Sequence, residues 1–254
     1  MSIQSIERAA AILRCLSSGP RRLGVSELST RLGLAKGTIH GILKTLHTEG
    51  FVEQDLESGK YQIGPALLQL GQTYLDVNEL RKQSLVWSEM LASKSNESVR
   101  VGVLRGGSVL IVHHVFRPDN SMQILEVGSN LPLHATALGK AMLAHKASLL
   151  EDVISDGLTR FTRNTITDAA LLTRELEVVR EHGCAEEREE AVLSEVGLAA
   201  PVFDARGEVA GAIGLHGSVR NVWSDGQPKA KLIDLVMDAA RAISRELGAE
   251  RSRG

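Results

Sequence analysis

The sequence predicts an α+β protein in two parts, a small helical part that ends in a β-hairpin and a larger part of mixed helices and strands. Three observations support this prediction. Apolar residues at helical spacing dominate residues 5–47, an apolar helical segment follows Pro65, and helical runs alternate with β-rich runs from Asn78 onward. The length of 254 residues is also enough for two domains.

The first part is predicted to begin with three short helices. Residues 5–17 carry apolar side chains at helical spacing, and a segment containing Ser, Gly and Pro then interrupts the pattern. A second helix follows, with Ser26 as its expected cap and Gly33 as its stop signal. After a tight connection, the stretch KGTIHGILKTLH, residues 36–47, forms the third helix.

A β-hairpin is predicted to follow the third helix. Residues 51–54 and 60–63 are strand-like, and Ser58 lies in the turn between them. Two helices, a tight turn, a third helix and a hairpin are the layout of a winged helix-turn-helix. We therefore predict a winged helix-turn-helix domain at residues 3–64, with the helix-turn-helix itself at about residues 25–44.

The rest of the chain is predicted to form a linker helix and a second domain. Pro65 suits the first turn of a helix over residues 65–77, which is so apolar that we expect it to be buried, for example against a partner subunit. Residues 78–250 form the second domain and close with an amphipathic helix at residues 229–247. The β-rich runs of this domain include SVRVGVLRGGSVLIVHHVF, MQILEV (residues 122–127) and APVFDARGEVAGAIGL, the last a hairpin turning at Ala205-Arg206-Gly207.

Composition indicates an ordinary core-forming protein. Hydrophobic residues make up 43% and charged residues 24% of the chain, and no apolar run approaches the roughly 18 residues of a membrane span. The N-terminus lacks the pattern of a signal peptide, and Cys15 and Cys184 suggest no disulfide framework. We therefore expect a cytoplasmic protein without a membrane partner.

Charge is unevenly distributed along the chain. The net charge is −2, but residues 1–64 contain eight Lys or Arg against six Asp or Glu. No carboxylate lies between Glu27 and Glu49, a gap that contains Arg31, Lys36 and Lys44. This basic stretch indicates a phosphate-bearing partner. Chance clustering on a solvated face is the alternative.

The third helix carries two glycines on the face opposite its predicted core stripe, although a glycine within a helix costs about 0.5–1 kcal/mol relative to alanine. Gly37 lies near the helix start, where this cost is small. Gly41 lies in mid-helix beside Lys44, and an outward glycine there removes a side chain where a partner must come close. The predicted core stripe, at i, i+3, i+4, i+7 spacing, is Ile39, Ile42, Leu43 and Leu46.

These features favour double-stranded DNA as the partner. A major groove about 12 Å wide admits a helix, and the first N–H groups of the helix, near Lys36, favour a phosphate. Solvated surface is the alternative for each residue alone, and RNA is less favoured because aromatic residues are only 3% of the chain. The candidate DNA-binding residues are Ser26, Lys36, Gly37, Thr38, His40, Gly41, Lys44, Thr45, Ser58 and Lys60.

Four segments together resemble the IclR family of bacterial transcriptional regulators: SIERAAAILRCL, LSTRLGLAKGTIHGILKTLHTEGFVEQDLESGKYQIG, LPLHATALGKAML and GLAAPVFDARGEVAGAIGLHG. The resemblance covers essentially the whole chain. It implies a linker helix between the winged helix-turn-helix and a GAF-like α/β effector-binding domain, and self-association as dimers that often pair into tetramers. Many members carry Arg where this chain has Gly41, so one DNA contact is absent or replaced here and the operator sequence is open.

The resemblance also implies an effector pocket. The candidate residues are Thr136, Ala137, Leu138, Glu187, Gly197, Gly214 and His216. The first three begin a helix whose unpaired N–H groups suit a carboxylate or phosphate; a helix simply capped by Thr136 is the alternative, as is a structural strand histidine at His216. Members that bind small keto acids tend to have cysteine and serine at the positions of Gly197, Gly214 and His216, which disfavours that ligand class. The implied effector is a small phosphorylated or hydroxylated metabolite.

Within the family, HGILKTLHTEGFVEQD and VLIVHHVFRPD are most similar to regulators of glycerol-utilisation operons in actinobacteria. This similarity implies a repressor released by a metabolite such as glycerol 3-phosphate, with a regulator of another carbon-source or aromatic catabolic operon as the alternative. An enzyme is disfavoured because no nucleophile motif flanks Cys184, and His113, His114 and Cys184 lack a metal-ligand spacing. We expect no cofactor and no metal.

Overall fold

The computed structural model describes residues 3–18, 20, 22–119 and 121–249. The chain divides between Val77 and Asn78 into two compact units. Each unit has its own hydrophobic core, so each is described by itself. Among the described residues, no helix combines the length and the apolar character needed to cross a membrane.

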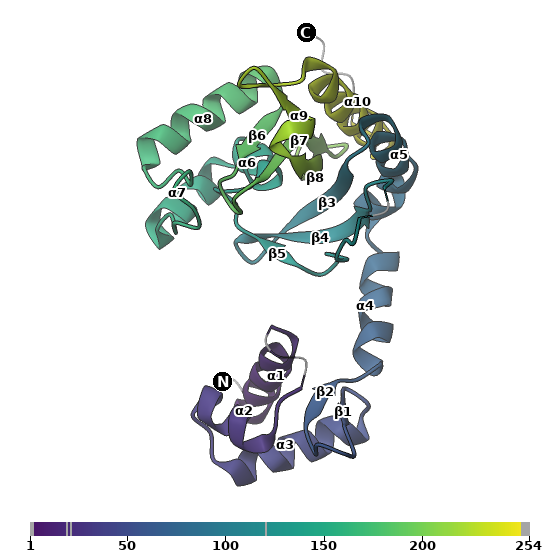
Figure 1. Ribbon diagram of the computed structural model, residues 1–254, viewed down its shortest axis with the longest axis vertical. Coiled ribbons are helices and arrows are strands. Elements are labelled where there is room, and N and C mark those ends of the chain that lie inside the picture. The colour runs from purple at the N-terminus through teal and green to yellow at the C-terminus, as the bar shows by residue number, and fades with distance from the viewer. Residues whose placement is uncertain (1–2, 19, 21, 120, 250–254) are drawn as a thin grey trace. The chain divides into compact units, whose positions relative to one another are not determined.

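The first unit contains three helices, a two-stranded hairpin and a fourth helix, in the predicted order (Figure 1). Its core joins the three helices to the hairpin through fully buried Ile12, Leu28, Leu43 and Val52. The antiparallel strands pair Glu53 with Gln62. The elements are α1 (Gln4–Ser17), α2 (Val25–Leu32), α3 (Lys36–Thr48), β1 (Val52–Gln54), β2 (Tyr61–Ile63) and α4 (Ala66–Asp76).

The expected cap of α2 is wrong, whereas its expected end is confirmed. Gly24, not Ser26, is the N-cap, and the Gly24 N–H donates to the Glu27 carboxylate at 2.7 Å. The glutamate reaches back to the cap position, so the helix begins ahead of the serine and leaves Ser26 exposed. At the other end Gly33 adopts a left-handed conformation with φ +64°, which favours glycine.

The linker helix α4 forms as predicted, but it has no buried residue. Leu68 and Leu70 are 66% and 58% exposed, and Tyr74 is also exposed. The predicted burial of this helix is therefore not met within the described chain. Burial against a partner subunit stays a prediction.

The second unit is built on a six-stranded antiparallel sheet in the order β5-β4-β3-β8-β7-β6. Helices α5 and α10 pack together against one face, and α6 packs against the other with α7 and α8 beside it (Figure 1). The strands are β3 (Ser98–Arg105), β4 (Ser108–Val115), β5 (Asn130–Leu131), β6 (Ala185–Arg188), β7 (Glu195–Phe203) and β8 (Val209–Ser218). The helices are α5 (Glu79–Ser95), α6 (Ala137–Leu143), α7 (Ala147–Asp156), α8 (Ala169–His182) and α10 (Ala230–Glu246), and a short segment holds α9 (Val219–Val222), β9 (Trp223–Ser224) and β10 (Gln227–Pro228).

One predicted strand, MQILEV at residues 122–127, is wrong. The segment runs beside β4 without regular ladder pairing. The Gln123 side-chain amide accepts from the Arg117 N–H at 2.8 Å and donates to the Arg117 carbonyl at 3.0 Å. The Glu126 N–H donates to His114 Nδ1 at 3.2 Å. Side chains thus take the place of a backbone ladder, whereas the predicted hairpin around Arg206 and the closing amphipathic helix are both confirmed.

Candidate DNA-binding helix and effector cavity

Helix α3 presents the two faces that its sequence predicts. Ile39 and Leu43 are fully buried and Leu46 is 6% exposed, while Ile42 is half-buried. The opposite face is open to solvent except at Thr38, which is half-buried. The exposed residues of this face are Lys36, Gly37, His40, Gly41, Lys44, Thr45 and Thr48.

Neither glycine of α3 is required by the fold. A Cβ atom placed on Gly37 or Gly41 would meet nothing within 4 Å. Neither glycine has a positive φ, so an alanine would be accommodated at both positions. The cost of Gly41 in mid-helix, about 0.5–1 kcal/mol, is therefore not offset by any packing within the chain. We therefore attribute Gly41 to a partner molecule that approaches this face of α3.

The start of α3 can receive an anion. Its N-cap is Ala35, which provides no side-chain cap. The first N–H groups of a helix lack partners within the helix and carry partial positive charge. Lys36 stands at this end, and no acidic residue lies in the first turn. This end of the helix therefore suits a DNA phosphate.

The wing residues are engaged within the first unit. The Asp55 carboxylate accepts from the Ser58 N–H at 2.9 Å and from the Ser58 hydroxyl, and these bonds hold the pKa of Asp55 below its ordinary value. Lys60 Nζ lies 3.1 Å from the Glu27 carboxylate. The Lys60–Glu27 ion pair is at the surface, where such pairs contribute little to stability, so Lys60 can exchange Glu27 for a phosphate.

Arg22 is a further surface cation beside the wing that the sequence did not single out. Its guanidinium lies 2.7 Å from Asp55, and its Nε donates to Gln62 at 3.0 Å. Both partners are more than 30 residues away along the chain. No local pattern could have identified it, because its position depends on how the hairpin packs.

The structure brings all seven candidate effector residues to one small hollow of about 20 Å³. Glu187 on β6 pairs in register with Gly197 on β7, which in turn pairs with His216 on β8. The hollow lies between these strands and the start of α6. Whether these residues bind an effector stays a prediction. The seven are Thr136, Ala137, Leu138, Glu187, Gly197, Gly214 and His216.

The protein itself supplies acceptors for two of the first N–H groups of α6, those of Ala137 and Gly139. Thr136 is the N-cap, and its hydroxyl accepts from the Gly139 N–H at 3.2 Å, as the simpler interpretation of this helix predicts. The Ala137 N–H donates to the Glu187 carboxylate at 3.3 Å. The prediction that the Ala137 N–H is unpaired is therefore wrong, because a carboxylate from β6 lies where an anion was expected. Burial raises the pKa of Glu187.

A glycine keeps the hollow open. A Cβ on Gly197 would lie 3.3 Å from both the Glu187 carboxylate and the Ala137 side chain. This is closer than an ordinary contact, so any side chain at this position would enter the space in front of Glu187.

A larger cavity of about 500 Å³ adjoins the hollow and shares Arg100 and His216 with it. Its charged groups are paired. Arg100 Nε forms an ion pair with Glu126, and His216 Nε2 lies 2.9 Å from Glu195. We call this space the outer cavity; the sequence did not predict Arg100, Glu126 or Glu195 in it. The sequence shows the alternation of side chains along β3 and β7, but it does not show which strands are neighbours in the sheet.

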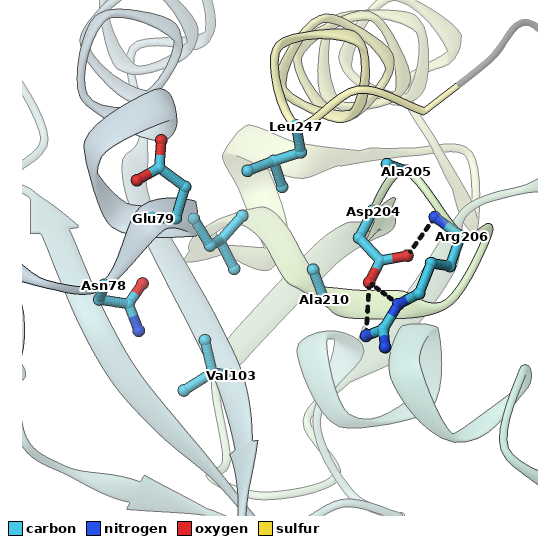
Figure 2. A pocket seen from close by; sticks show the side chains of 9 residues that line it. Asn78, Glu79, Val103, Asp204, Ala205, Arg206, Ala210 and Leu247 are labelled. Carbon is cyan, nitrogen blue, oxygen red and sulfur yellow. Dashed lines mark hydrogen bonds and ion pairs between the residues drawn. The ribbon is translucent and has the colours of Figure 1, made fainter.

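An open hollow of about 570 Å³ at the β7–β8 turn is a weaker candidate for a polar ligand (Figure 2). Its rim carries Asp204, whose carboxylate lies 3.0 Å from the Arg206 guanidinium and also accepts from two backbone N–H groups. Leu80, Val103 and Leu247 form apolar walls. Asp204 and Arg206 pair with each other, and Glu79 pairs with Lys82 outside the hollow, so these charged groups already have partners in the protein.

Two buried groups bear on the rejected enzyme hypothesis and on the rigidity of the unit. Burial raises the pKa of Cys184 to about 12, so its thiol stays protonated and is not a nucleophile. Lys140 on α6 is fully buried, and its Nζ lies 2.8 Å from Glu190 and 3.2 Å from Glu175. This cluster ties α6 to the loop between β6 and β7.

Known proteins resemble the whole chain. Two family profiles match, "IclR helix-turn-helix domain" over residues 5–56 and "Bacterial transcriptional regulator IclR C-terminal" over residues 72–245. The glycerol operon regulatory proteins of Streptomyces coelicolor and Streptomyces griseus are 49% and 50% identical over 250 residues, 98% of this chain and of each relative. The crystal structure of an IclR transcriptional regulator from Alicyclobacillus acidocaldarius has a TM-score of 0.84 at 26% identity, covering 98% of both chains.

Proposed function

Because this chain belongs to the IclR family of bacterial transcriptional regulators, we propose that it represses a glycerol catabolic operon and leaves its operator when a small metabolite binds. Two relatives that are glycerol operon regulatory proteins, at about half identity over nearly their full lengths, support the choice of operon. Because its proposed operator is cellular DNA, we propose that the protein acts in the cytoplasm.

The observation that carries the DNA-binding proposal is the outer face of α3. It combines Lys36 and Lys44 with Gly37 and Gly41, which the fold does not require. We place α3 in the major groove with the β1–β2 wing against the neighbouring backbone, in the manner of helix-turn-helix proteins. The exposed apolar residues of α4 support self-association, so the operator is expected to have two-fold symmetry.

The effector is proposed to bind at the hollow and the outer cavity. Small-molecule sites are commonly concave spaces of about 300–1,000 Å³ with a few placed polar groups, and the outer cavity has about 500 Å³. Its paired arginine, histidine and carboxylates can exchange partners with a small hydroxylated ligand. Glycerol 3-phosphate is the proposed effector.

The salt dependence of DNA binding tests this proposal. The full-length protein is titrated onto its own upstream DNA and onto a shuffled duplex of equal length, at several salt concentrations. We expect tighter binding to the upstream DNA, with log K falling by about 0.9 for each phosphate contact per tenfold rise in salt. Equal affinity for both duplexes would contradict operator recognition.

A further inference from the structure

Arg100 and His114 are directly opposed neighbours on β3 and β4. Directly opposed residues of an antiparallel pair project from the same face of the sheet, and both of these side chains line the outer cavity. Arg100 also lines the inner hollow, in which Glu187 lies. Arg100 therefore stands where the two spaces meet, with His114 beside it in the outer cavity.

The hydrogen bonds of His114 fix which ring nitrogen carries its proton. Nδ1 accepts from the Glu126 N–H at 3.2 Å, so Nε2 is the protonated nitrogen of the neutral ring. Burial lowers the pKa of His114 to about 4, which keeps the ring neutral at physiological pH. Nε2 is buried and, within the described part of the chain, has no hydrogen-bond partner. A buried donor without an acceptor is energetically costly, so a ligand oxygen that accepts from this N–H would be bound favourably.

Arg100 offers further hydrogen-bond donors beside His114. Its Nε is held by Glu126, and its side chain is 13% exposed. Among the residues that the structure describes, its ion pair with Glu126 runs through Nε, which leaves the terminal nitrogens to other acceptors. A guanidinium presents its terminal N–H groups as a planar fork that matches the oxygens of a carboxylate or a phosphate.

The inner hollow suits hydroxyl groups instead. The Glu187 carboxyl group already occupies the start of α6 through the Ala137 N–H, so an anion would have to displace it there. A carboxyl group at that place can exchange hydrogen bonds with a hydroxyl. The combined space is therefore polarised, with oxyanion donors at Arg100 and His114 and a hydroxyl partner at Glu187.

We propose that Arg100 and His114 form an oxyanion subsite that takes the phosphate or carboxylate of a small hydroxylated metabolite, whose hydroxyl end lies against Glu187. This inference rests on the proposed function, because it assigns the orientation of the effector in that site. It reverses the orientation that the sequence suggested, in which the anion binds at the start of α6.

Isothermal titration calorimetry on the full-length protein tests the subsite. The probes are glycerol 3-phosphate, glycerate, glycerol and inorganic phosphate. We expect the wild-type protein to bind at least one of the two anionic glycerol derivatives at least tenfold more tightly than glycerol. Tighter binding of the phosphate ester than of glycerate identifies a phosphate site, and the reverse identifies a carboxylate site.

Three variants locate the donors. Arg100→Gln and His114→Phe should each lower the affinity for the preferred anion roughly tenfold to a hundredfold, the range expected for a lost hydrogen bond to a charged group, with glycerol binding unchanged. Arg105→Gln, at the exposed end of the same strand, is the matched control and should bind as wild type. Circular dichroism and operator affinity establish that each variant is folded, and His114→Phe provides the test if Arg100→Gln is not.

Two results would overturn the subsite. One is a wild-type protein that binds neither anionic derivative more tightly than glycerol, even with operator binding intact. The other is a folded variant at Arg100 or His114 that keeps wild-type anion affinity. A protein that binds the anion through these residues but does not recognise its upstream DNA would instead refute the proposed function and leave the subsite standing.

Discussion

Replacing Gly41 by alanine should make the protein more stable and a poorer DNA binder at the same time. A Cβ at this position meets nothing within 4 Å, and the residue is exposed in mid-helix. The free protein should therefore gain the full difference in helix propensity, about 0.5–1 kcal/mol. If α3 lies closer to the groove here than in family members with Arg at this position, the added methyl group is forced against DNA. Overpacking of this kind costs roughly 1–3 kcal/mol, a loss of about five- to 150-fold in operator affinity.

The two units allow the stability change to be assigned. Both tryptophans, Trp87 and Trp223, lie in the second unit, so tryptophan fluorescence during urea unfolding reports on that unit. Hydrogen exchange of the α3 amides reports on the helix itself. Gly41→Ala should slow exchange in α3 and leave the fluorescence transition unchanged. Gly37→Ala, near the helix start, is the matched control and should slow exchange less.

The outcome for DNA binding decides the interpretation. A Gly41→Ala protein with wild-type operator affinity would refute the view that this glycine exists for a close approach to DNA. Unchanged or faster hydrogen exchange in α3 would refute the view that the fold does not require Gly41.

Four further predictions concern charged groups. Lys44→Ala should weaken operator binding and reduce the salt slope by about one phosphate contact, with metabolite affinity unchanged, as anisotropy titrations would measure. Glu187→Ala should weaken metabolite binding in calorimetry and spare operator affinity. Burial raises the pKa of Glu187 in the folded state, so above pH 4.5 the folded protein binds a proton that the unfolded chain has lost. The free energy of unfolding therefore decreases as the pH rises above 4.5. Glu187→Gln should reduce this decrease, as urea titrations at several pH values would measure. Lys140→Met should lower the free energy of unfolding by about 3–5 kcal/mol, since it leaves Glu190 buried without its partner.

The first unit could be predicted from the sequence because its signals are local. The buried stripe of α3 follows from residue spacing alone. The end of α2 follows from Gly33, because glycine readily adopts the left-handed conformation that this position has. Ser26 was placed wrongly because the helix is capped at Gly24, whose N–H donates to the Glu27 carboxylate. Propensity identifies the residues that can cap a helix, but not which of them the fold uses.

The second unit could be predicted in outline, and its site only through family resemblance. The hollow joins the start of α6 to residues on β6, β7 and β8, and the Ala137–Glu187 bond spans 50 residues. The meeting of Arg100 with His114 depends on strand register, which a sequence does not state. The segment at residues 122–127 has the composition of a strand, but the Gln123 side chain takes the backbone bonds that a strand would make.

The most direct test of the proposed function is fluorescence anisotropy of the full-length protein on its own upstream DNA, titrated with glycerol 3-phosphate. We predict a specific complex that dissociates as the metabolite is added, while the same concentration of inorganic phosphate leaves it bound. A specific complex that persists at saturating glycerol 3-phosphate would contradict that effector. The absence of any specific complex would contradict the assignment of the α3 face to DNA.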